Sequence, residues 1–182
     1  GVQLDAQDNI YLTGTYIEEV IFDASAPNAR LSGISPNDGD GYLAKFDSNG
    51  NYLWSKRFAG TGIDAGIDIE INPAGEIVVL GHFGNSLQFD PAQSSSLRIS
   101  AGAGDIFMAA YNANNGNFKW AQSIAGIGFD NPRALAIDAL GNYYINGDYT
   151  STITFSLSPL STLVSTGGND VFVAKYDVNR NF

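Results

Sequence analysis

Apolar and polar residues alternate along the chain in short segments, and a period of two is typical of β-strands. Val2–Leu4 and Ile69–Ile71 each place a polar residue between two large apolar ones. In Tyr42–Phe46 two large aromatic side chains lie on either side of an alanine on the same face. No segment shows the period of a helix. The pattern therefore predicts an all-β protein.

One pattern occurs three times, at intervals of 65 to 67 residues. The positions that recur are the glycines Gly14, Gly81 and Gly147, the phenylalanines Phe22, Phe89 and Phe155, the aspartates Asp40, Asp105 and Asp170, the tryptophans Trp54 and Trp120, and the glycines Gly60 and Gly126. Because the register holds along whole copies, we divide the chain into repeats 1–66, 67–132 and 133–182. The first repeat begins inside a strand, and the third lacks most of its last strand.

Each repeat holds four predicted strands, named a to d. Strand a is Val2–Leu4, Ile69–Ile71 and Leu135–Ile137; strand b is Ile10–Tyr16 and its copies; strand c is Tyr42–Phe46, Phe107–Tyr111 and Phe172–Tyr176; strand d is Tyr52–Phe58 and Phe118–Ile124. Turns of the form Asp-x-x-Gly-Asn join a to b and c to d, because Asp folds onto the backbone and Gly accepts a positive φ. The longer connection from b to c is predicted to be an extra hairpin or an ordered loop.

Four antiparallel strands in a repeat of about 66 residues describe the blade of a β-propeller. A β-solenoid of stacked hairpins is the alternative, but its coils are usually much shorter. Three blades cannot close a ring. We therefore expect these blades to be part of a larger propeller or of a ring that another chain completes.

The repeat resembles the bacterial seven-bladed β-propeller repeat family, called SBBP for short. The residues that match its motif are Asp138, Gly141, Asn142, Tyr144 and Gly147, then Gly167, Asp170, Phe172, Ala174, Lys175 and Asp177, and, at the end of the motif, Asp47, Gly50, Asn51 and Trp54. The resemblance covers essentially the whole chain. Asp8 and Arg180 depart from it because each stands where the motif has the turn glycine, which puts the geometry of those turns in question.

The resemblance implies a bacterial surface or secreted protein in which such arrays serve as scaffolds or binding modules. It implies an extracellular location, and it brings no catalytic residues with it. Arrays of this kind would contact proteins or glycans through their loops and would adjoin the remaining blades of the same or another chain.

Charge and composition narrow the classes of partner. The formal net charge is −10, so a nucleic-acid backbone would be repelled. The chain has no Cys, which excludes disulfides and zinc–thiolate sites. No apolar run reaches the roughly 18 residues of a membrane span.

Recurrent acids are the weak candidates for a metal site. Asp40, Asp105 and Asp170 recur just before strand c, and Asp64 and Asp130 recur in the loops from strand d to strand a. Acids repeated at one height of the blades could ring a channel and hold Ca²⁺. The plainer interpretation is that each Asp accepts backbone N–H groups within its own blade. No other cofactor is predicted.

The remaining chemistry is sparse. His82 is the sole histidine, which excludes a multi-histidine zinc site in this chain, and no catalytic motif surrounds it. The segment Asp47–Asn51 begins like a calcium loop but lacks the closing Glu, so we interpret it as a turn. Five tyrosines could include a platform for sugars, although most fit strand packing: Tyr11, Tyr16, Tyr143, Tyr144 and Tyr149.

We therefore predict a non-enzymatic propeller module that presents loops for binding. One alternative is a structural protomer of an extracellular assembly, whose blades are completed by neighbouring chains. The other is a propeller-type carbohydrate-active hydrolase, which predicts paired carboxylates with raised pKa values at one mouth of the channel.

Overall fold

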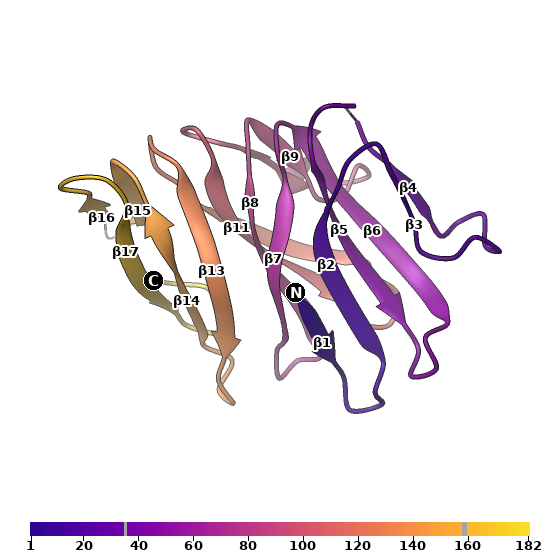
Figure 1. Cartoon of the computed structure of the whole chain (residues 1–182). Helices are drawn as coiled ribbons and strands as arrows, with labels where there is room; N and C mark the ends of the chain where they lie inside the picture. Colours follow the sequence, from indigo (N-terminus) through magenta and orange to yellow (C-terminus); the bar gives the residue numbers. More distant parts are fainter. Residues whose placement is uncertain (35, 158–159) are drawn as a thin grey trace.

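The structure is a computed structural model, and it describes residues 1–34, 36–157 and 160–182. Three β-sheets lie side by side along the molecule, in chain order (Figure 1). The strands nearest the viewer, β13, β7 and β1, are the first strands of the three sheets. The predicted all-β class is confirmed, and each sheet is a propeller-type blade.

The strands of the blades follow the predicted order a, b, c, d. Blade 1 consists of β1 (Val2–Leu4), β2 (Ile10–Tyr16), β5 (Asp40–Phe46) and β6 (Tyr52–Thr61). Blade 2 consists of β7 (Ala65–Ile71), β8 (Glu76–Phe83), β11 (Asp105–Asn112) and β12 (Phe118–Ile124). Blade 3 consists of β13 (Asp130–Ile137), β14 (Tyr143–Tyr149) and β17 (Asp170–Tyr176). All neighbouring strands in a blade are antiparallel.

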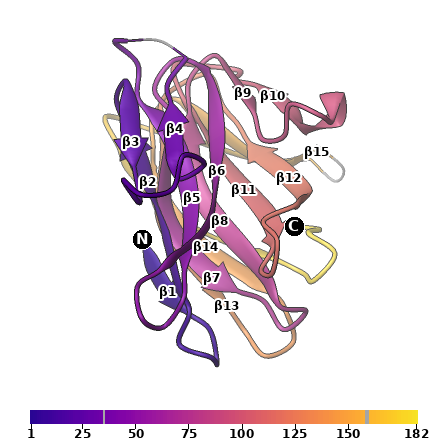
Figure 2. The same ribbon diagram turned by 90° about the vertical axis from the view of Figure 1, so that its right-hand side faces the viewer.

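Each connection from strand b to strand c contains a second, small hairpin, which was one of the two predicted forms. The three hairpins are β3 (Glu19–Ile21) with β4 (Arg30–Ser32), β9 (Ser86–Gln88) with β10 (Leu97–Ile99), and β15 (Thr152–Leu157) with β16 (Leu160–Val164). A 3-10 turn at Ser94–Ser96 lies inside the second of them. These hairpins stand at one end of the blades (Figure 2).

The hairpin of one blade pairs with the last strand of the blade before it. The end of β6, Ala59–Thr61, pairs with Ser86–Gln88 of β9, so that the sheet of blade 1 continues into a hairpin of blade 2. A single bridge from Ala125, just after β12, to Thr154 of β15 repeats this contact one blade further on. The hairpins therefore tie neighbouring blades together.

A glycine makes this pairing possible at each junction. A Cβ atom on Gly60 would stand 1.5 Å from the carbonyl oxygen of Ser86, and one on Gly126 would stand 1.6 Å from that of Thr152. No other residue fits at such a distance from a backbone atom. The recurrence of Gly60 and Gly126 thus marks the point where the hairpin meets the preceding blade.

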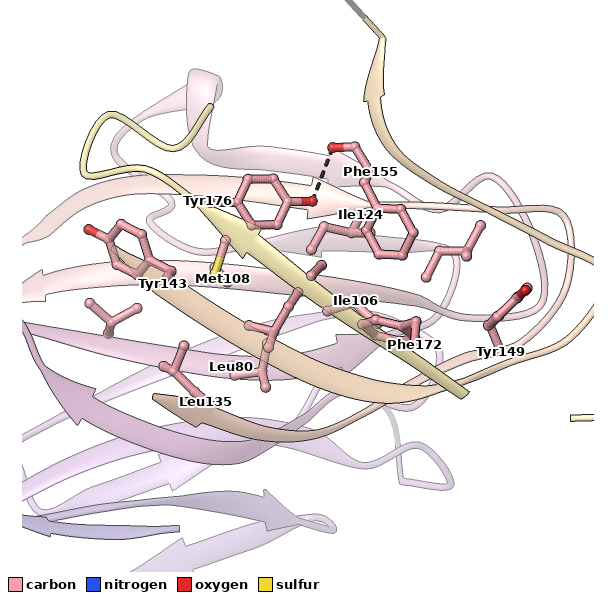
Figure 3. Close-up of a cluster of buried hydrophobic side chains, with 14 of the residues drawn as sticks. Leu80, Ile106, Met108, Ile124, Leu135, Tyr143, Tyr149, Phe155, Phe172 and Tyr176 are labelled. Carbon is pink, nitrogen blue, oxygen red and sulfur yellow. Dashed lines mark hydrogen bonds between the residues drawn. The ribbon is translucent and has the colours of Figure 1, made fainter. Parts of the chain in front are cut away.

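The blades are held by apolar clusters between their faces. One cluster joins blades 2 and 3, and Figure 3 shows Leu80 and Met108 of blade 2 facing Tyr143 and Phe172 of blade 3. A second cluster joins blades 1 and 2. Burial of this apolar area is the main term that favours the stacked arrangement.

The turns keep their geometry where the sequence departs from the motif. Asp8 and Arg180 adopt φ values of 60° and 68°, close to the 84° of Gly141. In each turn an N–H donates to the carbonyl of the first turn residue, at 3.0 Å for Asp8 and 2.8 Å for Arg180. The turns are thus preserved, at the cost of a left-handed backbone on residues with a Cβ.

Strand a is longer than predicted in blades 2 and 3, where β7 starts at Ala65 and β13 at Asp130. A register shift interrupts each of them, between Gly66 and Asp68 and between Pro132 and Ala134. These irregularities break the alternation of side chains, which is why the pattern of the sequence located only the last part of each strand.

Candidate functional site: grooves between neighbouring blades

A groove of about 600 Å³ lies where blades 1 and 2 meet, and we name it groove A. Its walls are Ser55–Arg57 of β6, the turn Phe89–Ala92 that follows β9, the turn Gly116–Phe118 before and at the start of β12, and Arg30–Ser32 of β4. Tyr111 of β11 also lines it, so the groove combines blade strands (β6, β11 and the start of β12) with two turns and a short hairpin strand.

A groove of about 810 Å³, groove B, lies at the junction of blades 2 and 3. It is lined by Gln122 and Ser123 of β12, by Phe155–Leu157 of β15 and by Arg180–Phe182. These positions correspond in the repeat to β6, the hairpin and the turn of groove A. The groove is therefore a property of the repeat, formed once at each blade junction.

Stacked aromatic rings form the base of both grooves. Phe89 stacks on Phe118 with 6.1 Å between ring centroids and 17° between ring planes, and Phe155 stacks on Phe182 at 5.2 Å and 14°. In each pair the first ring comes from the hairpin segment between strands b and c, and the second comes from the residue that follows the turn after strand c. This explains why the phenylalanine of the hairpin recurs in the sequence.

Groove A carries cationic side chains on an acidic chain. Arg30 is paired with Glu19 at 2.8 Å, and Arg57 donates to the carbonyl oxygen of Ser32. The ammonium group of Lys56 has no hydrogen-bond or ion-pair partner among the residues that the structure describes. The groove also contains the carboxylate of Asp90, which accepts the N–H of Ala92 at 2.9 Å and the side-chain amide of Gln93 at 2.7 Å. Lys56 is thus the cationic group of groove A that remains available to a ligand.

Groove B has a different cationic side chain from groove A: it is Arg180, from the turn after β17, and not a residue of strand d. Arg180 lies over the ring of Trp120, with 4.5 Å from the guanidinium carbon to the ring centroid. The equivalent pair in groove A is Trp54 with Gly116, whose added Cβ would stand 2.9 Å from the tryptophan ring. The tryptophan of strand d therefore packs on the turn of the next blade, and a cation–π contact compensates the strained turn at Arg180.

The outer edge of β6 is open beside groove A. Its residues Tyr52–Phe58 pair with β5 on one side, while on the other side, within the described ranges, only Ala59–Thr61 have a strand partner, β9. Unpaired backbone N–H and C=O groups along a strand edge accept an added strand. Groove A thus combines an open strand edge, apolar rings and a cation.

The recurrent acids lie elsewhere, buried at the blade junctions in pairs. Asp40 lies near Asp64, and Asp105 lies near Asp130; these four are at most 1% exposed, whereas Asp170 is half-buried. Among the described residues no group of three or more His, Cys or acidic side chains could hold a metal ion. The Ca²⁺ site stays a prediction, and the structure brings the acids together two by two.

The acids before strand c accept backbone N–H groups, as the plainer interpretation expected. The donors are the N–H of Ile34 for Asp40 (2.7 Å), those of Ala101 and Gly126 for Asp105 (2.6 and 3.0 Å), and that of Thr166 for Asp170 (3.1 Å). The bonds from Ile34, Ala101 and Thr166 close the loop between the hairpin and strand c, and the bond from Gly126 holds the segment that follows strand d. These carboxylates therefore fix the loops that shape the grooves.

The acids from the d-to-a loops have raised pKa values. Burial, together with the carboxylate of Asp40, raises the pKa of Asp64 to about 8, although an N–H of Gly84 opposes the shift. Burial and the nearby carboxylate of Asp105 raise the pKa of Asp130 to about 8. Neither oxygen of Asp130 has a hydrogen-bond partner among the described residues. The hydrolase interpretation predicted such pairs, but here they are shut off from solvent.

The other candidate residues, namely His82, Asp47 and the five tyrosines, have contacts that indicate a structural role. His82 lies half-buried on β8, 6.0 Å from the ring of Phe129, and burial lowers its pKa. Asp47 accepts the N–H groups of Asn49 and Asn51 at 2.9 and 2.8 Å, the geometry of a turn. Four of the five candidate tyrosines are buried, and only Tyr144 is half-exposed.

The grooves themselves were not predicted from the sequence. Lys56 and Arg57 stand in a strand whose alternation gave no reason to single them out. The sequence showed that Phe22, Phe89 and Phe155 recur, but no role was assigned to them. This recurrence is the signal that could have located the grooves, because Phe89 and Phe155 each form part of the base of a groove. The loops from strand b to strand c, expected to supply contacts, do form one wall.

Comparison with known proteins adds one relative. The chain is 25% identical, over 201 residues, to an uncharacterized WD repeat-containing protein of Acanthamoeba polyphaga mimivirus. The match covers 97% of this chain and 14% of the relative, so the chain spans a small part of that protein's length. No family model matches the chain. WD repeats are four-stranded propeller blades, which agrees with the fold described above.

Among the residues that the structure describes, none belongs to a helix that is long and apolar enough to cross a membrane.

Proposed function

We propose that this chain is a non-enzymatic propeller module that binds extended segments of partner proteins in the grooves between its blades. The observation that carries the proposal is the recurrence of one groove, built from the same parts of the repeat, at both junctions. A rigid frame that presents loop-lined grooves is the usual arrangement of a binding scaffold.

Groove A favours an extended peptide with acidic side chains. An added strand on the open edge of β6 would continue the pairing that β9 already makes with Ala59–Thr61. Lys56 would receive a carboxylate from that segment, and the stacked rings of Phe89 and Phe118 would receive an apolar side chain. Glycans are the second class of ligand that the loops could contact, through the same rings.

The similarity to a WD repeat-containing protein supports the scaffold proposal, because that relative is named for a repeat that forms propeller blades. The location at a bacterial surface rests on the resemblance of the repeat to SBBP sequences, and it is proposed on that ground alone. Fractionation of the native source, with antibody detection of the chain, tests it.

The binding proposal is tested with a library of short synthetic peptides of varied charge, immobilised on an array and probed with the labelled chain. We expect the retained peptides to be rich in Asp and Glu and to be lost with the variant Lys56→Glu. Lys119→Glu is the matched control, because Lys119 is exposed on β12 and lines neither groove.

Two results would contradict the proposal. One is retention of no peptide above background by the wild-type chain. The other is retention that Lys56→Glu and Lys119→Glu change equally, since a general change of charge would then explain it.

A further inference from the structure

A cavity of about 210 Å³ lies beside the end of β8 in blade 2, and we name it the His82 pocket. Its walls come from four segments in the middle of the chain, which has a blade on either side of them: Gly62–Ile63 between blades 1 and 2, His82–Asn85, Ala103–Gly104 before β11, and Phe129 before β13. None of these residues lines groove A or groove B. The pocket is therefore a separate feature of the molecule.

The rim of the His82 pocket carries two large apolar side chains. Ile63 and Phe129 stand at equivalent positions of successive repeats, each just before the buried aspartate of its loop. They are 60% and 43% exposed, although the loop of each lies between two blades. Phe83, which also lines the pocket, is fully buried. The remaining wall has no side chains beyond Cβ, at Gly62, Gly84, Ala103 and Gly104. The chain thus leaves an apolar hollow that its own side chains do not fill.

His82 supplies one polar group to this hollow. Its packing against Phe129 leaves the ring nitrogens without hydrogen bonds among the described residues, and of the two only Nδ1 is buried. Because burial lowers the pKa of His82, the ring is neutral near pH 7 and carries a single N–H. A buried N–H without a partner is rarer than a buried acceptor without one, so we place the proton on the accessible Nε2. His82 therefore offers a hydrogen-bond donor.

Asn85 supplies the second polar group. Its backbone has a φ of 48°, and its carbonyl oxygen accepts the N–H of Ser100 at 2.7 Å, which fixes the residue beside the pocket. Its side chain is exposed, and an amide side chain offers an acceptor as well as donors. Among the described residues that line the pocket none is charged. The polar chemistry of the site is thus one imidazole and one amide.

The size and chemistry of the pocket select its occupant. About 210 Å³ is below the roughly 300–1,000 Å³ of pockets for cofactors and other small molecules, so it suits a single side chain. A charged side chain would lose its hydration without gaining a counter-charge. The rings of His82 and Phe129 lie 6.0 Å apart at 57°, a tilted pair that a further ring can extend. A phenol hydroxyl accepts from an N–H and donates to an amide oxygen through one atom.

We propose that the His82 pocket binds a tyrosine side chain of a partner protein. The Nε2–H of His82 donates to the phenol oxygen, and the phenol O–H donates to the amide oxygen of Asn85. Ile63 and Phe129 cover the two faces of the bound ring. Tyrosine is among the side chains that most often anchor protein interfaces in pockets of this kind. The site does not use the grooves, so it stands or falls independently of the proposed groove binding.

The test is a titration of the isotope-labelled chain with N-acetyltyrosinamide, followed by NMR. We expect shifts of the backbone N–H signals of Gly62, Gly84 and Gly104 and of the imidazole of His82, with a dissociation constant of about 1 mM. N-acetylphenylalaninamide should bind about tenfold more weakly, because His82 and Asn85 then lose their partner. N-acetylargininamide should bind more weakly than either.

Two variants locate the site and identify the donor. A Cβ on Gly84 would stand 3.4 Å from the Cα of Gly62, an ordinary contact, so Gly84→Leu should fold, fill the pocket and abolish binding. Gly168→Leu, with open space around its Cβ, is the matched control and should bind as the wild type does. His82→Phe keeps a ring but removes the N–H, so the preference for the tyrosine amide over the phenylalanine amide should shrink from about tenfold to about threefold or less. Lys56→Glu, in groove A, should change neither affinity.

Three results would overturn the proposal. One is the absence of shifts at the pocket glycines with about 20 mM N-acetyltyrosinamide, a concentration that would saturate the expected site. Another is equal binding by Gly84→Leu and Gly168→Leu, because the ligand then lies elsewhere. The third is a preference for the tyrosine amide that is absent in the wild type or unchanged in His82→Phe, which tests the donor even if Gly84→Leu does not fold.

Discussion

The phenylalanine of the second hairpin should be among the most costly residues to remove. Phe89 is 2% exposed, and its ring lies 5.0 Å from Phe107, 6.1 Å from Phe118 and 6.3 Å from Phe58. These neighbours belong to both blade 1 and blade 2, so the ring fills the junction. Phe89→Ala should lower the free energy of unfolding by about 3–5 kcal/mol.

The repeat supplies the control for this prediction. Phe22 holds the equivalent position in blade 1, with ring contacts to Tyr42, Phe46 and Tyr52 at 5.3 to 6.2 Å, but it is half-buried, and within the described residues all three of these rings belong to its own blade. Phe22→Ala should therefore cost only about 1–2 kcal/mol. The difference isolates what the neighbouring blade contributes.

Thermal unfolding followed by circular dichroism measures both variants. For a chain of this length 1 kcal/mol corresponds to about 2–4 °C in the melting temperature, so Phe89→Ala should melt about 6–20 °C lower than the wild type. Equal losses for Phe89→Ala and Phe22→Ala, or a loss below about 1 kcal/mol for Phe89→Ala, would refute the idea that this ring locks two blades together.

Two further predictions concern buried positions. Gly81→Ala should cost about 2–3 kcal/mol in a chemical denaturation curve, because its Cβ would stand 2.1 Å from the carbonyl oxygen of Ala65, while Gly167→Ala, with open space around it, should be near neutral. Asp130 has a folded pKa of about 8, above its unfolded value, so its neutral form stabilises the fold; that stability is full below about pH 4 and is lost as the pH rises through 8. Asp130→Asn should therefore flatten the fall in melting temperature between pH 5 and pH 8, whereas Asp8→Asn, the same charge change at an exposed site, should leave the slope as it is.

The strands and turns of each blade could be predicted because the residues that specify them lie close together in the sequence. Alternation located β2, and the copies of the Asp-x-x-Gly-Asn turn located its neighbours. The turns at Asp8 and Arg180 kept their form without glycine because the opening Asp still accepts the N–H groups of the turn; Asp177 does so for Asn179 and Asn181 at 2.8 Å each. A turn of this kind, in which one side chain fixes the backbone of the next four residues, can be recognised from the sequence alone.

The contacts between blades could not be predicted, because they depend on how the sheets stack. The pairing of β9 with β6 joins two different repeats, and alternation within one strand says nothing about its partner. The same holds for Asp105 and Asp130, for which a ring around a channel was one of two interpretations and which lie buried near each other at a junction. The recurrence of Gly60 and Gly126 was the available sign that backbone approaches backbone there.

The attachment of each hairpin to the preceding blade is the claim on which the grooves depend, and a cross-link tests it most directly. The side-chain oxygens of Thr61 and Ser86 lie 3.1 Å apart across the pair of β6 and β9. The chain has no cysteine, so the double variant Thr61→Cys/Ser86→Cys contains the sole possible disulfide. We predict that it oxidises in air to a monomeric cross-linked chain, seen by intact mass, and melts higher than its reduced form. In the control variant Thr61→Cys/Ser95→Cys the two thiols should stay free. Thiols that stay free to the same extent in Thr61→Cys/Ser86→Cys would contradict the account.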